Sequence, residues 1–185
     1  KTGRDIAFED VNIELQNQLS HHRLNAAVTL PDELGKELRL ALDIDGNLLN
    51  RRDWVGEVYL KTEQLKPARW LKDTDIQGLS FQQGTIDLEL WSRWQGGELE
   101  MVEGQLDLSA LNVTGGDGTL PLRRVAGEFR FDKDVEGWKL QLQRALLQEG
   151  EQEVEPFSLR LRHSEGESRL VARNLDLKRM MLVAA

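Results

Sequence analysis

The sequence has no cysteine in its 185 residues, which excludes disulfide bonds and thiolate metal sites and is compatible with either the cytosol or an oxidising periplasm. No run of apolar residues approaches the length of a membrane-spanning helix. A serine elbow, a glycine-rich nucleotide turn and a zinc signature are also missing. We therefore expect neither a helical membrane span nor an enzyme, and we predict no catalytic residue, no cofactor and no metal.

Basic residues are fewer than acidic ones, 24 against 32, which gives a net charge of -8. A nucleic-acid partner would require a basic surface facing its phosphates, so none is expected. The hydrophobic fraction of 39% and the charged fraction of 30% are typical of a soluble protein.

Histidines are scarce, and the three present are His21, His22 and His163. Adjacent side chains of a strand point to opposite faces, so the first two indicate a solvated turn rather than a metal site. Carboxylates spaced two residues apart share a strand face, but such pairs are commonplace in so acidic a chain, and we assign them to polar faces rather than to acid–base catalysis. These pairs are Asp43 with Asp45, Asp73 with Asp75, and Asp87 with Glu89.

What the sequence does contain is alternation of apolar and polar residues, clearest in the stretch GTIDLELWSRWQGGELE that begins at Gly84. Because strand side chains alternate, Ile86, Leu88 and Leu90 fall on one face, and the intervening polar residues fall on the other. The same pattern recurs along most of the chain, with glycine-containing turns in between. These features predict an all-β, curved antiparallel meander.

A glycine opens four of the predicted strands with the same spacing to the apolar positions that follow it. We expect this glycine to mark a bend or a bulge that lets the sheet curl. The four positions are Gly56, Gly84, Gly104 and Gly127.

Non-strand structure is sparse. The segment Pro67 to Lys72 predicts one short helix, since proline suits the first helical turn, and the glycine-rich segment Thr114 to Thr119 predicts a plain loop. We expect residues 1–185 to be a single segment of a longer protein, with 1–61 and 84–177 mainly strands and 62–83 a short helix and connecting loop. One small helix cannot cover a large apolar sheet face.

Something must lie against that face, because each exposed leucine or phenylalanine forgoes roughly 1.5 to 3 kcal/mol of burial energy. A second part of the same sheet would give a sandwich or barrel with an ordinary core. A bilayer around a closed barrel is disfavoured by the single tyrosine and the short strands. A lipid lying in a trough is the third alternative.

Two stretches of the chain, WVGEVYLKTEQLKPARWL and GTIDLELWSRWQGGELEMVEGQLDLSALNV, resemble the YhdP family of Gram-negative envelope proteins, within the AsmA-like group that includes TamB. The matching features are Trp54, Gly56, Tyr59 and Leu60 before the short helix, and then Leu88-x-Leu90-Trp91 with a second tryptophan and a Gly-Gly turn. The segments DIAFEDVNIELQN and PFSLRLRH are similar to that family as well, so the resemblance covers approximately Asp5 to His163.

The resemblance implies a taco-shaped β groove of repeated β units, anchored in the inner membrane, that crosses the periplasm and carries phospholipids to the outer membrane. This chain would be an internal periplasmic segment that shields acyl chains without catalysis. Its implied partners are phospholipid acyl chains and neighbouring β-groove segments of the same chain. The competing interpretation is a β-sandwich interaction module that binds glycan or protein.

The predicted groove lining is the set of apolar side chains that share one face: Leu38, Leu40, Leu42, Val58, Leu60, Ile86, Leu88, Leu90, Leu106, Leu108, Phe129, Phe131, Leu140, Leu142, Leu159 and Leu161. Pattern alone does not distinguish a leucine that contacts lipid from one that contacts another leucine. Trp91 and Trp94 would stack on a sugar, lie at a lipid headgroup boundary or brace a hairpin by cross-strand packing, and we favour bracing.

Overall fold

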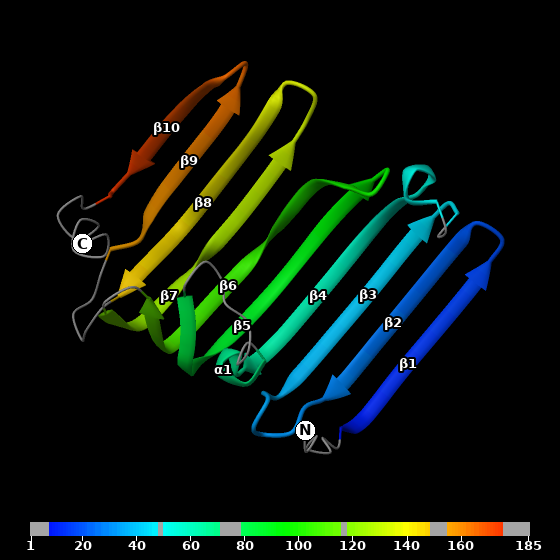
Figure 1. Cartoon of the computed structure of the whole chain (residues 1–185), viewed down its shortest axis with the longest axis horizontal. Coiled ribbons are helices and arrows are strands. Elements are labelled where there is room, and N and C mark those ends of the chain that lie inside the picture. The colour runs from blue at the N-terminus through cyan, green and yellow to red at the C-terminus, as the bar shows by residue number, and fades with distance from the viewer. Residues whose placement is uncertain (1–7, 48–49, 71–78, 116–117, 149–154, 176–185) are drawn as a thin grey trace.

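The computed structural model describes residues 8–47, 50–70, 79–115, 118–148 and 155–175, which form ten strands, one short α-helix and one 3-10 turn (Figure 1). The strands in chain order are β1 (Glu9–Gln18), β2 (His21–Thr29), β3 (Glu37–Asp45), β4 (Val55–Leu65), β5 (Leu79–Gln95), β6 (Glu98–Gly115), β7 (Gly118–Lys133), β8 (Gly137–Gln148), β9 (Phe157–Ser164) and β10 (Glu167–Arg173). The 3-10 turn η1 spans Arg51–Asp53, and the helix α1 spans Pro67–Trp70.

All ten strands lie in one sheet, in the order in which they occur in the chain, and each is antiparallel to its neighbours. The predicted all-β antiparallel meander is therefore confirmed. Figure 1 shows the strands side by side from β1 at one edge to β10 at the other, without a second sheet packed against them in the described part of the chain. The sandwich interpretation was wrong in this respect.

The connection between β4 and β5 is shorter than the predicted 62–83, because β4 continues to Leu65 and β5 already begins at Leu79. A register shift after Thr62 allows β4 to continue, and Leu65 then pairs with Ile86. The helix begins at Pro67 as predicted, and 71 and 72 lie outside the described residues. Both ends of the predicted glycine-rich loop belong to strands, since Thr114 of β6 pairs with Thr119 of β7. Residues 116–117 lie outside the described residues.

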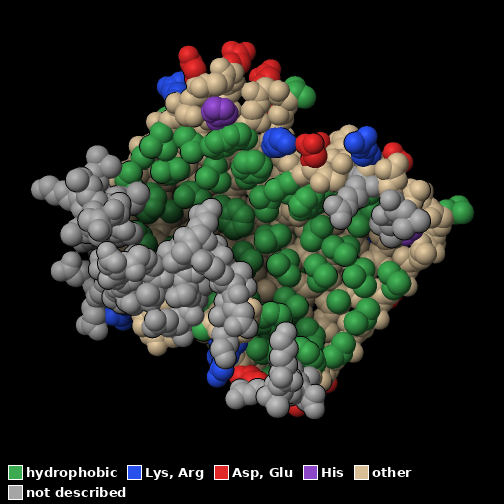
Figure 2. Space-filling model, viewed as in Figure 1, with side chains coloured by type: hydrophobic (Ala, Val, Ile, Leu, Met, Phe, Trp, Pro, Cys, Tyr) green, Lys and Arg blue, Asp and Glu red, His purple; other side chains and the backbone are tan. Residues whose placement is uncertain are grey.

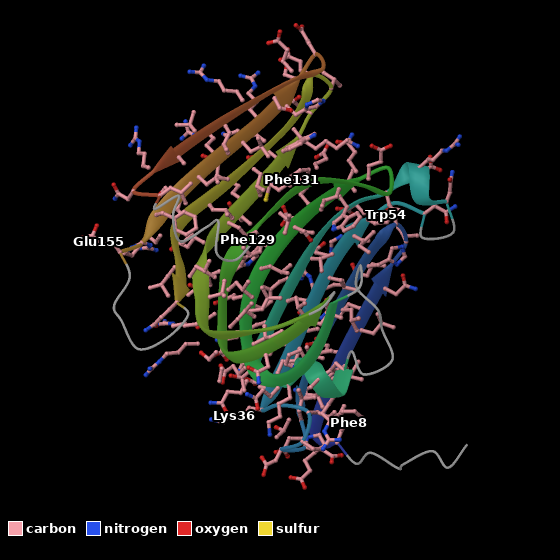
Figure 3. The ribbon with its side chains drawn as sticks, turned by 60° about the vertical axis from the view of Figure 1, so that its left-hand side comes forward. Phe8, Lys36, Trp54, Phe129, Phe131 and Glu155 are labelled. Atoms are coloured by element: carbon pink, nitrogen blue, oxygen red, sulfur yellow. The ribbon has the colours of Figure 1, made fainter. Side chains whose placement is uncertain are left out.

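Bulges recur in alternate strands and explain why the sheet curls. Gln64 in β4, Ala110 in β6 and Arg144 in β8 have positive φ angles of 48°, 51° and 49°, and the ladders β4–β5, β5–β6 and β8–β9 shift register nearby. Each bulge inserts a residue, which bends its strand and increases the local twist. In Figure 3 the ribbons of β5 to β7 curve strongly towards their lower ends.

The four recurrent glycines have two structural roles. Gly84 has a φ of 111°, and Gly127 lies at a register shift, so these two mark bends as predicted. Gly56 and Gly104 lie in regular pairing, and for them the prediction was wrong. Their role is close approach: a Cβ on Gly104 would lie 2.2 Å from the carbonyl oxygen of Glu89.

A small core closes one end of the sheet, where the β2–β3 connection meets α1. Leu30 and Leu34 are only 4% and 7% exposed, and Pro67 is fully buried. The carbonyl oxygen of Leu34 accepts hydrogen bonds from the Lys66 N–H at 2.9 Å and from the indole Nε1 of Trp70 at 3.0 Å. These contacts fix the short helix against the sheet.

Candidate functional site: the apolar face of the sheet

The pairing register brings the predicted lining residues together on one face. A row across the sheet joins Leu40 to Leu60, Leu60 to Leu90, and Leu90 to Gly104, and it continues through Phe129 and Leu142 to Leu159. Directly opposite residues of antiparallel strands share a face, so the whole row is on one side. Parallel rows place the remaining predicted residues on that same side: Leu38, Leu42, Val58, Ile86, Leu88, Leu106, Leu108, Phe131, Leu140 and Leu161.

Figure 2 looks onto this side of the molecule and shows hydrophobic side chains spread across most of the strands, with charged side chains along the rim. The apolar face extends beyond the predicted set. Leu24 and Val28 of β2 pair with Leu42 and Leu38, and Leu15 of edge strand β1 pairs with Leu24. Their alternation was present in the sequence, whereas Val102 was missed because the next position on its face is Gly104, which breaks the apolar alternation.

Burial on this face is incomplete. Among the side chains whose burial the structure describes, the only buried apolar ones are Leu30, Leu34, Ala145 and Pro67, and all sixteen predicted lining residues are partly exposed. The solvent-accessible surface of the chain is 13550 Å², whereas a compact globular protein of 21.1 kDa has about 9000 Å². The chain therefore has a broad apolar face that its described residues do not cover.

Two buried polar side chains, Thr62 and Ser92, interrupt the apolar rows. Thr62 lies between Leu38 and Leu88, is 4% exposed, and its Oγ1 has no hydrogen-bond partner among the described residues. A buried hydroxyl without a partner costs roughly 1 to 3 kcal/mol. The other buried polar residue, Ser92, accepts a hydrogen bond from Trp94 Nε1 at 3.0 Å.

Aromatic side chains gather at one end of the apolar face. Trp94 is opposite Gly56, and Trp138 is opposite His163. The Trp138 ring lies 6.3 Å from that of Phe131 and 5.7 Å from that of His163, measured between centroids, with both pairs stacked. Trp and His rings combine an apolar body with a polar edge, which suits the boundary between an apolar surface and water.

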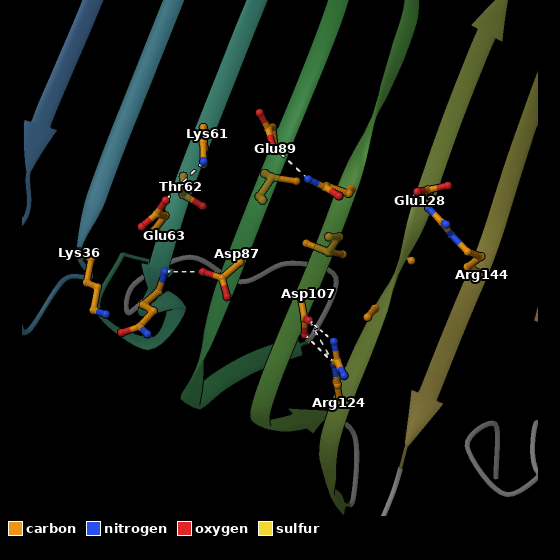
Figure 4. Close-up of a pocket in the computed structure, with 16 residues that line it drawn as sticks. Lys36, Lys61, Thr62, Glu63, Asp87, Glu89, Asp107, Arg124, Glu128 and Arg144 are labelled. Carbon is orange, nitrogen blue, oxygen red and sulfur yellow. Dashed lines mark hydrogen bonds and ion pairs between the residues drawn. The ribbon is translucent and has the colours of Figure 1, made fainter. Parts of the chain in front are cut away.

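The opposite face of the sheet is charged, and its carboxylates are engaged by neighbouring basic or polar groups. Figure 4 shows Arg124 beside Asp107 and Arg144 beside Glu128 on adjacent strands. Arg23 donates two hydrogen bonds to Asp43, of 3.0 and 2.7 Å, and this guanidinium lowers the pKa of the Asp43 carboxyl.

The predicted carboxylate pairs follow the same pattern. Asp87 accepts a hydrogen bond of 2.7 Å from the Gln64 N–H, and Glu89 accepts one of 2.8 Å from the Tyr59 hydroxyl. Asp73 and Asp75 lie outside the described residues. These hydrogen bonds to neighbouring strands account for Asp87 and Glu89 as parts of a polar strand face.

The histidines differ from the prediction of a solvated turn. His21 and His22 begin strand β2 and do point to opposite faces. His21 Nδ1 lies 2.9 Å from Asp45 Oδ1, and its Nε2 lies 3.6 Å from Asp43 Oδ1, so that the three residues could hold a metal ion. Local spacing carries no signal for this cluster, because the two carboxylates reach His21 from the next strand.

Together, these features define a class: a single-layer, curved β sheet with one open apolar face and one charged face. Within the described ranges, neither helix has the length and apolarity of a membrane span. A family model described as YhdP protein matches residues 3–185. The chain therefore belongs to the YhdP family and is a segment of an AsmA-like bacterial envelope protein. No curated protein and no solved structure matches it.

Proposed function

We propose that the apolar face forms one stretch of a periplasmic, lipid-carrying groove, which shields the acyl chains of phospholipids between the inner and outer membranes without catalysis. The observation that supports this proposal most directly is the pairing register of the strands, which places the apolar side chains on one face. Rows rich in leucine and phenylalanine run across the sheet from β3 to β9, interrupted only by a few small or polar residues, and they remain partly exposed. Acyl chains are a partner of matching chemistry, since they exchange water for apolar contact along the whole face.

The curvature of the sheet fits the same purpose. Ten strands spaced about 4.8 Å apart make a surface on the order of 50 Å across. Bulges in β4, β6 and β8 bend this surface, and a bent sheet surrounds an acyl chain from more than one side. A flat sheet of the same composition would leave one flank of each chain in water.

Both edges of the sheet support continuation into neighbouring segments. All residues of β1 and of β10 are exposed, and each of these strands is paired on one side only. Ile13 and Leu15 of β1, 65% and 70% exposed, extend the apolar face to the edge itself. We propose that neighbouring β-groove segments of the same chain pair with these edges, and that the full-length protein is anchored in the inner membrane.

The test is photo-crosslinking in the full-length envelope protein. A photo-reactive amino acid is placed at Leu88 and, in a separate variant, at Glu89, the next residue on the opposite face. We expect labelled phospholipid to be attached at Leu88 and not at Glu89. Absence of adducts at Leu88, repeated at Leu106 and Phe129, would contradict the groove and would mean that protein covers the face.

A further inference from the structure

The charged face carries a feature that lipid shielding does not use: an exposed tryptophan between two hollows. Trp91 is 45% exposed and lies on the side of the sheet opposite to Leu90. Its ring is 5.1 Å from that of Tyr59 on the adjacent strand, at an interplanar angle of 44°. The predicted cross-strand bracing is thus present, yet it leaves almost half of Trp91 in water.

Two hollows meet at Trp91. One has a volume of about 390 Å³, and the other, on the Tyr59 side, has a volume of about 570 Å³. Both volumes fall within the range of roughly 300 to 1,000 Å³ that small-molecule sites occupy. A ligand that spans both hollows would cross the exposed face of the indole ring.

The charged groups around the smaller hollow are paired with one another. Arg130 pairs with Glu103 at 2.5 Å and with Asp132 at 2.8 Å, so its guanidinium is held between two carboxylates. Arg130 is the one cation among the described residues that line this hollow, so none of them is left over to attract a phosphate or carboxylate ligand. This argues against a charged ligand and in favour of a neutral one.

The groups that remain available are amides. Gln105, Gln141 and Gln143 line the smaller hollow with Trp91, Glu103 and Arg130. Gln105 donates to Glu89 at 3.0 Å, whereas the side chains of Gln141 and Gln143 make no hydrogen bond to another described residue. Each free amide offers two N–H donors and one carbonyl acceptor, which matches a ligand that carries several hydroxyl groups.

We propose that the hollows on either side of Trp91 form a binding site for a neutral oligosaccharide. A sugar ring has an apolar C–H face that packs on the indole, whose electron-rich face attracts the ring hydrogens. Its hydroxyl groups then meet Gln141 and Gln143. The site lies on the face opposite to the apolar rows, so it is independent of the lipid-carrying function.

The experiment is a titration of this 185-residue chain with N,N′,N″-triacetylchitotriose and, in parallel, maltotriose, both neutral, followed through the indole N–H signals in ¹H–¹⁵N NMR spectra. The Trp91 signal is assigned with Trp91→Phe. We expect one of the trisaccharides to shift that signal and the apolar-face variant Trp94→Ala to bind it as the unaltered chain does. Trp91→Ala should lose binding, with an affinity at least about tenfold lower.

Because Trp91→Ala also removes the contact with Tyr59, a second variant keeps the strand packing intact. Gln141→Ala with Gln143→Ala removes only the free amides, and we expect about tenfold weaker binding with an unchanged midpoint of urea unfolding. The inference is overturned if neither trisaccharide shifts the Trp91 signal, if Trp91→Ala binds unchanged, or if Trp94→Ala loses binding equally. Capture of a protein, but of no saccharide, through Trp91 would also overturn it.

Discussion

Replacement of Leu88 by alanine tests whether this residue lies on an open apolar face or in a closed core. Leu88 is only partly exposed, and the change removes three carbon atoms. At about 0.8 kcal/mol for each buried CH₂, complete burial would make the loss roughly 2.4 kcal/mol, and the partial exposure of the side chain reduces it to roughly 1.5 to 2 kcal/mol. No cavity term is added, because the site opens to solvent in the described structure.

The matched comparison is Leu34→Ala in the small core beside α1, where the side chain is 7% exposed. Leucine-to-alanine changes in closed cores cost roughly 2 to 5 kcal/mol, and we expect Leu34→Ala to fall in that range. The measurement is urea unfolding of lipid-free protein, monitored by tryptophan fluorescence. If Leu88→Ala costs as much as Leu34→Ala, the face is covered by protein and the groove argument is refuted.

Three further predictions concern single sites. Gly104→Ala should lower the free energy of unfolding by roughly 1 to 3 kcal/mol, because its Cβ would meet the Glu89 carbonyl at 2.2 Å; an unchanged urea midpoint would contradict this. Thr62→Val should be neutral or stabilising by up to about 1 kcal/mol in the same assay, since it removes a buried hydroxyl without a partner among the described residues; a clear loss of stability would show that this hydroxyl is bonded. Arg23→Gln should raise the pKa of Asp43 towards its ordinary 3.8 in an NMR titration. The ion pair stabilises the fold above that pKa and loses its contribution as the pH falls through the lower folded value, so an unchanged Asp43 titration would contradict the assignment.

The strand faces could be predicted from the sequence because alternation is a local property. Ile86, Leu88 and Leu90 share a face whatever they pair with, and glycine-containing turns join consecutive strands into hairpins. An antiparallel meander follows from those two facts alone. The apolar face was therefore located correctly, although its contact with lipid stays a prediction.

The bulges and the long-range clusters could not be predicted in the same way. Gln64, Ala110 and Arg144 have positive φ without being glycine, so no residue type marks them. Their conformations are imposed by pairing with neighbouring strands. Likewise, His21 meets Asp43 only through the β2–β3 register, which local spacing does not encode.

The uncrossed strand order also determines how such a protein changes length. Each strand pairs only with those before and after it in the chain, so stability is approximately a sum over neighbouring strands, as in repeat proteins. Inserting one hairpin widens the sheet by about 9.6 Å. Because two strands are added, the strands that follow keep their original direction, and all other pairings stay as they were. Evolution can thus adjust the span of the protein two strands at a time, without redesigning a shared core.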